Sequence, residues 1–487
     1  MTFARMSESL VILSQFDPRR LELLPRPMLL NIPTEIQEVI ILDAAIVSPA
    51  SIASLSATCS LLRTLINIPL DGHLWRSIFL AFFDDPRQAL SLESNTPVDK
   101  VVFNWQREAQ RRFRAKFRLE QSHTAEIEEF EDIVDEDAVN ALMETAINAL
   151  PGQALNVSSK NETYVTECMR GVILSPPTTQ SSAKLRVLAA LVDARTSASL
   201  PILPLASASS RLPSRAYVYN MRNYNERNKW GPWLPFKDGS KDGEINYIHL
   251  WHIIDVLRHN AHERNNCDLP IDGIGGLRAL SMPKQDLHVE KEEDTAKTKY
   301  NDWAGVEGVW MRTVSFMDYR DLHAYNWSNF DTEGGEGQLS TAVFEHENFA
   351  EAFRVIRAYF TVVRVEETGP PGYPHRPTIH FVGDTAIPNY PHDVSMHRIT
   401  EGTVSMTEAG QVRWSFNTRV GGHEWSSEGV QLGRVQSRAG VVGIWSSADH
   451  EEHDPAGPFW LWKCGESTKR PSKFPGPFHY LIIHHDQ

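Results

Sequence analysis

The chain has 487 residues, and because a single hydrophobic core rarely organises so long a chain, two or three structural units are expected. Hydrophobic residues make up 41% and charged residues 23% of the total, which is typical of a globular protein. The formal net charge of -14 repels a phosphate backbone and argues against nucleic-acid binding, and the lack of an apolar run of membrane-spanning length argues against a membrane partner.

The cysteines and the amino-terminal residues indicate a reducing compartment. Residues 1–20 lack the charged start, apolar stretch and cleavage site of a secretory signal. The four cysteines are scattered and form no Cys-x-x-Cys pair, so neither a zinc knuckle nor a disulfide framework is expected. The cytoplasm, the nucleus or both are therefore the expected locations.

After an expected flexible lead-in over residues 1–27, the sequence predicts a helical unit over residues 28–80. Pro33 suits the first turn of a helix, where a backbone N–H has no intrahelical partner. Ser48-Pro49 is a second helix start. Each start is followed by apolar residues at helical spacing, namely Ile36, Val39 and Ile40 after the first and Ile52, Leu55, Cys59, Leu62 and Ile66 after the second. We expect Val39 and Trp75 to pack inside this unit.

Helical patterns continue through residues 81–195 and then stop. Residues 196–215 are expected to be a Ser/Pro-rich linker or loop, because Pro201, Pro204 and Pro213 oppose a helix. Residues 216–299 form a mixed segment that includes a charged, exposed loop over residues 283–299.

Strand patterns dominate residues 300–465. The clearest is a hairpin of residues 403–407 and 411–417, in which apolar and polar residues alternate and Gly410 supplies a positive φ for the turn. Further strands are predicted over residues 309–317, 352–365, 378–382, 424–432, 441–446 and 459–463. The expected fold class is α+β multidomain, with an N-terminal all-α region, a C-terminal antiparallel β-barrel or sandwich and a tail over residues 466–487.

Four histidines of the mixed segment lie close together in the sequence, as metal ligands can, but their spacing does not favour a metal site. On a helix, His252, His259 and His262 share a sector. The opposite face is apolar and consists of Leu250, Ile253, Ile254 and Leu257. The histidines, His249 among them, are therefore expected on the solvated side. Residues 450–454 are expected to form an exposed loop. Without an HExxH, GxSxG or phosphate-loop motif, we predict no metal, no cofactor and no catalytic residue.

Tryptophans and arginines of the strand region are candidates for a substrate-recognition surface, because both residue types are favoured at binding hot spots. The candidates are Trp310, Arg312, Arg357, Arg364, Arg413 and Trp425. The alternative is core packing for the tryptophans and solvent exposure for the arginines.

The order of four features in the helical unit resembles an F-box. These features are Ile32-Pro33-Thr34-Glu35-Ile36, the helix start at Ser48-Pro49 with Leu55, the Cys59–Arg63 stretch and Leu74-Trp75-Arg76. The resemblance implies docking onto a Skp-type adaptor protein and, through it, onto a cullin. It assigns the docking contact to Ile32, Pro33, Ile36, Ile40, Leu55 and Leu62, although some of these must form the core of so small a unit.

Stretches of the strand region, such as residues 308–312, 425–433 and 454–460, resemble a domain of large fungal F-box proteins. The resemblance implies a non-catalytic substrate-recognition adaptor of a Skp–cullin–F-box (SCF) ubiquitin ligase, in which the β domain holds an unknown target protein. Two alternatives stay open. One is a non-degradative F-box scaffold, and the other is a small-ligand-binding barrel or hydrolase with a helical appendix. A deep pocket with converging polar groups favours the second alternative, and a filled barrel opposes it.

Overall fold

The computed structural model describes residues 28–68, 72–122, 135–150, 159–170, 172, 176–192, 211–235, 243–264, 269–271, 273–283, 300–327, 339–386 and 398–465. The predicted lead-in, the tail, most of the predicted linker and most of the charged loop lie outside these residues. The chain forms two compact units. The first runs to Phe82 and includes Asn104–Phe113, and the second comprises Phe83–Phe103 and the chain from Arg114 onward.

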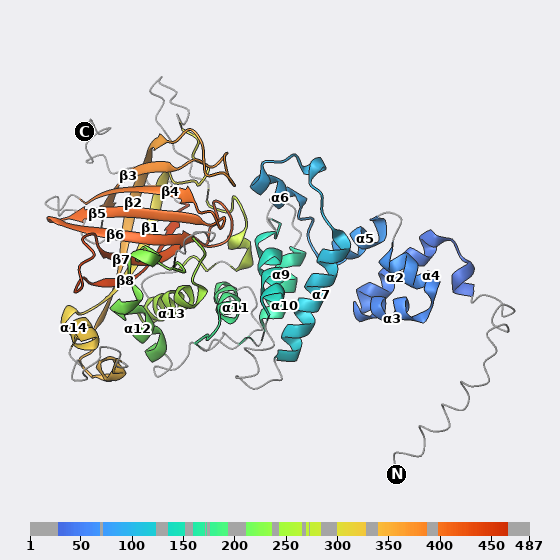
Figure 1. Ribbon diagram of the computed structural model, residues 1–487, viewed down its shortest axis with the longest axis horizontal. Coiled ribbons are helices and arrows are strands. Elements are labelled where there is room, and N and C mark those ends of the chain that lie inside the picture. Colours follow the sequence, from blue (N-terminus) through green and yellow to red (C-terminus); the bar gives the residue numbers. More distant parts are fainter. Residues whose placement is uncertain are drawn as a thin grey trace, which may run out of the picture. The chain divides into compact units, whose positions relative to one another are not determined.

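The first unit is helical, which confirms the predicted N-terminal helical region. Its elements are η3 (Met28–Asn31), α2 (Thr34–Val47), α3 (Ala50–Thr58), α4 (Ser60–Asn67), α5 (His73–Phe82) and the first part of α7 (Trp105–Ser122) (Figure 1). Pro33 stands immediately before α2 and Pro49 immediately before α3. The predicted apolar stripe does not form one helix, because the extended backbone of Cys59 separates α3 from α4.

The core of the first unit is built around Trp75. This side chain is 2% exposed, and its indole N–H donates to the carbonyl of Ile66 at 2.6 Å. The rings of Phe79 and Trp105 pack in a T-shaped arrangement, with centroids 5.3 Å apart. The expected interior position of Trp75 is confirmed, but that of Val39 is wrong. α2 buries only the narrow stripe of Gln37, Ile41 and Ala45, and Val39 on another face is 52% exposed.

The second unit combines helices with a β-barrel. Its main helices are α6 (Arg87–Ser94), the rest of α7, α9 (Glu136–Ile147), α10 (Lys160–Met169), α11 (Gln180–Leu191), α12 (Leu212–Val218), α13 (Tyr247–Arg264) and α14 (Tyr319–Trp327). α13 lies against β7 and β8 of the barrel and also contacts α11 and α12 (Figure 1). The predicted loop over residues 196–215 is partly wrong, because α12 begins inside it and carries Pro213 in its first turn, where proline is tolerated.

Eight antiparallel strands close into an up-and-down barrel. They are β1 (Gly308–Met317), β2 (Glu351–Val365), β3 (Ile379–Ala386), β4 (Ile399–Met406), β5 (Val412–Val420), β6 (His423–Gln431), β7 (Val441–Ser447) and β8 (Ala456–Lys463). Each strand pairs with its sequence neighbours, and β1 also pairs with β8. The predicted strands and the hairpin are confirmed, and Gly410 in the hairpin turn has φ +82°. Of the two predicted β folds, a barrel and a sandwich, the structure adopts the barrel.

One end of the barrel is filled with aromatic and aliphatic side chains. Trp310 and Trp414 are completely buried, with ring centroids 5.0 Å apart. Around them pack Phe360, Phe381, Phe416 and Phe459. Small residues make room for these rings: a Cβ on Gly402 would lie 2.3 Å from the Cβ of Phe416. This packed end therefore closes the barrel interior on one side, and we call it the floor of the barrel. Any site inside the barrel lies in the other half.

Candidate functional site

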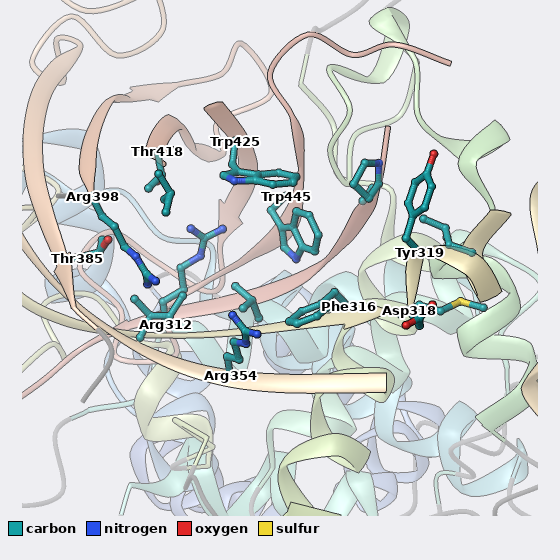
Figure 2. A pocket seen from close by; sticks show the side chains of 17 residues that line it. Arg312, Phe316, Asp318, Tyr319, Arg354, Thr385, Arg398, Thr418, Trp425 and Trp445 are labelled. Carbon is teal, nitrogen blue, oxygen red and sulfur yellow. The ribbon is translucent and has the colours of Figure 1, made fainter. Parts of the chain in front are cut away.

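The other half of the barrel is open and holds a cavity of about 480 Å³. Strands supply most of its wall, and the start of α14 contributes to its rim (Figure 2). The lining residues are Arg312, Val314, Phe316, Met317, Asp318, Tyr319, Leu322, Arg354, Ile356, Thr385, Arg398, Thr418, Val420, Trp425, Trp445, Pro455 and Ala456. The barrel interior is thus filled at one end and hollow at the other.

Strand alternation brings these residues together. Arg312, Val314 and Phe316 stand two apart on β1, so all three face the barrel interior. Val314 pairs with Arg354 on β2, and Thr418 pairs with Trp425 across β5 and β6. Residues directly opposite each other in antiparallel strands lie on the same face, so the register converts sequence-distant residues into one wall.

Arg312 is the most unusual residue of this cavity. It is only 7% exposed, and its guanidinium lies over the rings of Phe459 (4.7 Å) and Phe416 (5.1 Å). Nη2 donates to the hydroxyl of Ser427 at 2.8 Å, while the buried Nε–H has no acceptor among the described residues. Burial lowers the pKa of Arg312 from 12.5 to about 9, so the side chain still carries its charge at neutral pH.

Positive charge prevails elsewhere in the lining. Arg354 is exposed at the wall and stacks its guanidinium over Phe316 at 4.9 Å, and Arg398 lines the cavity near Thr385 (Figure 2). Asp318 is the one acidic residue of the lining. Its carboxylate accepts from Nε of Arg320 at 3.1 Å, and this hydrogen bond lowers the pKa of Asp318. The charged residues of the lining are therefore three arginines and one aspartate, and the aspartate is paired with Arg320.

Aromatic rings form the apolar part of the wall. Trp425 and Trp445 meet edge to face, with centroids 5.4 Å apart, and Phe316 meets Trp445 at 6.4 Å. The indole N–H of Trp445 donates to the carbonyl of Ser315 at 3.1 Å, which fixes the orientation of this ring. A fixed aromatic wall is suited to flat or chain-like apolar groups.

Of the six predicted recognition residues, the structure brings Arg312 and Trp425 to the cavity and places the other four elsewhere. Trp310 is completely buried in the filled end and donates to Val306 at 2.8 Å. Arg357 alternates with inward-facing Ala358 and so lies on the outer face of β2. Arg364 contacts His380, and Arg413 forms a two-pronged ion pair with Glu428 at 2.7 and 2.9 Å.

Sequence reasoning missed Arg354, Arg398 and Trp445. A signal for Arg354 was present, since it shares an alternation phase with the apolar residues Ile356, Ala358 and Phe360 of β2. A charged residue on the apolar face of a strand indicates a site. The register that brings the three residues to one cavity depends on strand pairing, which no local pattern contains.

The predicted docking residues are divided between surface and core of the first unit. Ile36 is 50% exposed and Ile40 is 39% exposed. Pro33 is exposed, and Ile32 and Leu55 are half-buried. Leu62 is 4% exposed and therefore belongs to the core of the unit, as we expected for some of these six residues.

The histidines of α13 are not on a solvated face, apart from His262. His249, His252 and His259 are 2%, 4% and 4% exposed, so that expectation is wrong for these three. His252 Nδ1 lies 3.0 Å from the Ser214 hydroxyl, which donates to Asp255 at 2.6 Å. In this order the serine hydroxyl hydrogen points to the carboxylate, so the histidine is not placed to receive it as a base. Within the described ranges, no group of three or more His, Cys, Asp or Glu side chains is arranged to hold a metal ion.

Residues 450–454 form the loop between β7 and β8, as predicted. His450, the first of these residues, packs against the rest of the unit, because its ring stacks on Trp230 with centroids 3.7 Å apart. Among the helices that the structure describes, none is long and apolar enough to cross a membrane.

Comparison with known proteins gives no independent assignment: no family model, no curated protein and no solved structure matches the chain.

Proposed function

We propose that the chain is the substrate-recognition adaptor of a Skp–cullin–F-box ubiquitin ligase. The first unit docks onto a Skp-type adaptor, and the β domain holds the target protein. In this role no residue of the chain acts as nucleophile or base, because the contribution of an adaptor is to raise the local concentration of the target near the conjugating machinery.

The observation that supports docking is the apolar surface of α2. Five large apolar side chains of this one helix are substantially exposed: Ile36 (50%), Val39 (52%), Ile40 (39%), Ile46 (52%) and Val47 (87%). Full burial of each such side chain is worth about 1.5–3 kcal/mol. Apolar residues gathered on one element in this way support a protein-binding role for α2.

The start of α2 is held in a defined shape. The side-chain amide of Gln37 donates to the carbonyl of Ile32 at 3.1 Å, and Ile36 N donates to the carbonyl of Pro33 at 3.0 Å. The residues that resemble the F-box start, Ile32 and Pro33, are thus fixed beside the exposed Ile36. A preformed contact surface reduces the conformational cost of binding.

Co-purification of the full chain with a fungal Skp-type adaptor tests this proposal. We expect the wild type to retain the adaptor and the double variant Ile36→Asp/Ile40→Asp to lose it, because two charges would then have to be buried in an apolar contact. Val102→Asp is the matched control, since Val102 is 97% exposed and lies outside the first unit. It should bind like the wild type.

Two results would count against the proposal. One is a wild type that fails to retain the adaptor. The other is an equal loss of binding in Val102→Asp and in the α2 double variant, since that would indicate a general effect of added charge.

A further inference from the structure

Arg312 is a buried cation that lacks an anionic partner. Among the described residues no carboxylate pairs with it, and its only hydrogen bond goes to the neutral Ser427 hydroxyl. Contact with the faces of Phe416 and Phe459 compensates in part for lost water. An unpaired buried charge remains costly unless an opposite charge reaches it.

The cavity supplies a route for such a charge. Arg312 lies where the filled end meets the cavity, because its guanidinium covers Phe416 and Phe459. From Arg312, β1 runs along the cavity wall past Val314 and Phe316. Four residues of strand span about 13 Å, and the volume of about 480 Å³ equals that of roughly sixteen water molecules. The space therefore suits a small molecule, with its charged end on the floor.

The wall indicates what the rest of that molecule is. The apolar part of the lining includes Val314, Phe316, Ile356, Trp425 and Trp445, and Figure 2 shows the rings of Phe316, Trp425 and Trp445 at the cavity. Such a wall favours an apolar body, and a guanidinium matches the two oxygens of a carboxylate. The peptide groups of a polypeptide would each need hydrogen-bond partners. The side chains of Val314, Phe316 and Ile356 offer none, and the indole N–H of Trp445 already donates to Ser315, so a free acid fits this part of the wall better than a chain terminus.

We propose that the barrel cavity binds a free organic acid, with its carboxylate on Arg312 and its apolar body between Phe316, Trp425 and Trp445. Arg354 adds positive potential along the wall and favours entry of the anion. This site belongs to the barrel alone and does not depend on whether the first unit binds a Skp-type adaptor.

Calorimetric titration of the full chain with decanoate and with decan-1-ol tests the site. We expect decanoate to bind more tightly than decanol, and Arg312→Met to weaken decanoate binding about 10- to 100-fold, as loss of a charged hydrogen bond requires. Binding of decanol should not weaken in the variant. Arg438→Gln is the control, because Arg438 is exposed in the loop between β6 and β7 and does not line the cavity.

Arg312→Lys keeps the charge and should bind decanoate more tightly than Arg312→Met, which separates loss of charge from a folding defect. Equal affinity of the wild type for decanoate and decanol would overturn the proposal, and so would undiminished decanoate binding by Arg312→Met. A peptide with a free carboxyl-terminal phenylalanine that binds more tightly than decanoate would overturn the assignment to a free acid.

Discussion

Arg312 occupies a position at which strand alternation otherwise places apolar side chains. Trp310 precedes it and Val314 and Phe316 follow it on the same face of β1. Its presence there costs stability, because burial disfavours the charged form and lowers its pKa. Sites that bind ligands commonly carry such a cost, and removing it stabilises the fold at the expense of function.

At the residue scale, we therefore predict that Arg312→Met stabilises the ligand-free protein. The gain should be about 0.5–2 kcal/mol in the free energy of unfolding, measured by urea denaturation at pH 7. Methionine fills much of the same volume and adapts to an irregular site.

Arg413→Met is the contrasting variant. Arg413 is ion-paired, and its loss leaves the 8% exposed Glu428 without its partner, so we expect destabilisation by about 1–3 kcal/mol. A destabilised Arg312→Met protein would show that the guanidinium serves the fold and not a ligand.

At the element scale, α13 is buried on more sides than its sequence suggests. Periodicity shows one apolar face, and the structure covers that helix with β7 and β8 as well as with α11 and α12. The histidines between them gain partners instead of water: the Tyr217 ring stacks on His252 at 4.5 Å, and the Tyr224 hydroxyl lies 3.2 Å from His249 Nε2. Periodicity within one helix reports its own apolar residues and not the elements that pack on it.

This burial predicts acid sensitivity. Loss of hydration lowers the pKa of His249 from 6.5 to about 3 and that of His252 to about 4. Above pH 6.5 neither folded nor unfolded chain binds these protons. Below pH 6.5 the unfolded chain binds these protons and the folded chain does not, so the free energy of unfolding falls as the pH drops toward 4. Each histidine lowers it by at most about 1.4 kcal/mol per pH unit.

Urea denaturation at pH 7, 6 and 5 measures this effect. His249→Gln should flatten the dependence of the unfolding free energy on pH, whereas His262→Gln should not, because His262 is exposed. An unchanged slope in His249→Gln would mean that His249 is not held neutral in the fold.

At the scale of the whole molecule, the sequence predicts the division into a helical region and a β domain, and most strands, because alternation and turn residues act locally. It does not predict that β1 and β8 pair and close a barrel, since that pairing joins residues far apart in the chain. Residue type alone makes Arg312 and Trp425 candidates, whereas the pairing that brings Arg398 and Trp445 to the same cavity joins distant strands and is absent from the local pattern. The local F-box-like features around Pro33 are the basis for proposing a Skp-type adaptor as the partner, and this partner stays a proposal.

The exposed α2 surface is central to the adaptor proposal, and hydrogen–deuterium exchange of the full chain with and without a Skp-type adaptor tests it most directly. The proposed docking predicts slower amide exchange over residues 28–47 in the complex and unchanged exchange in the barrel strands. Protection confined to the barrel, or no protection of α2 at saturating adaptor, would contradict it.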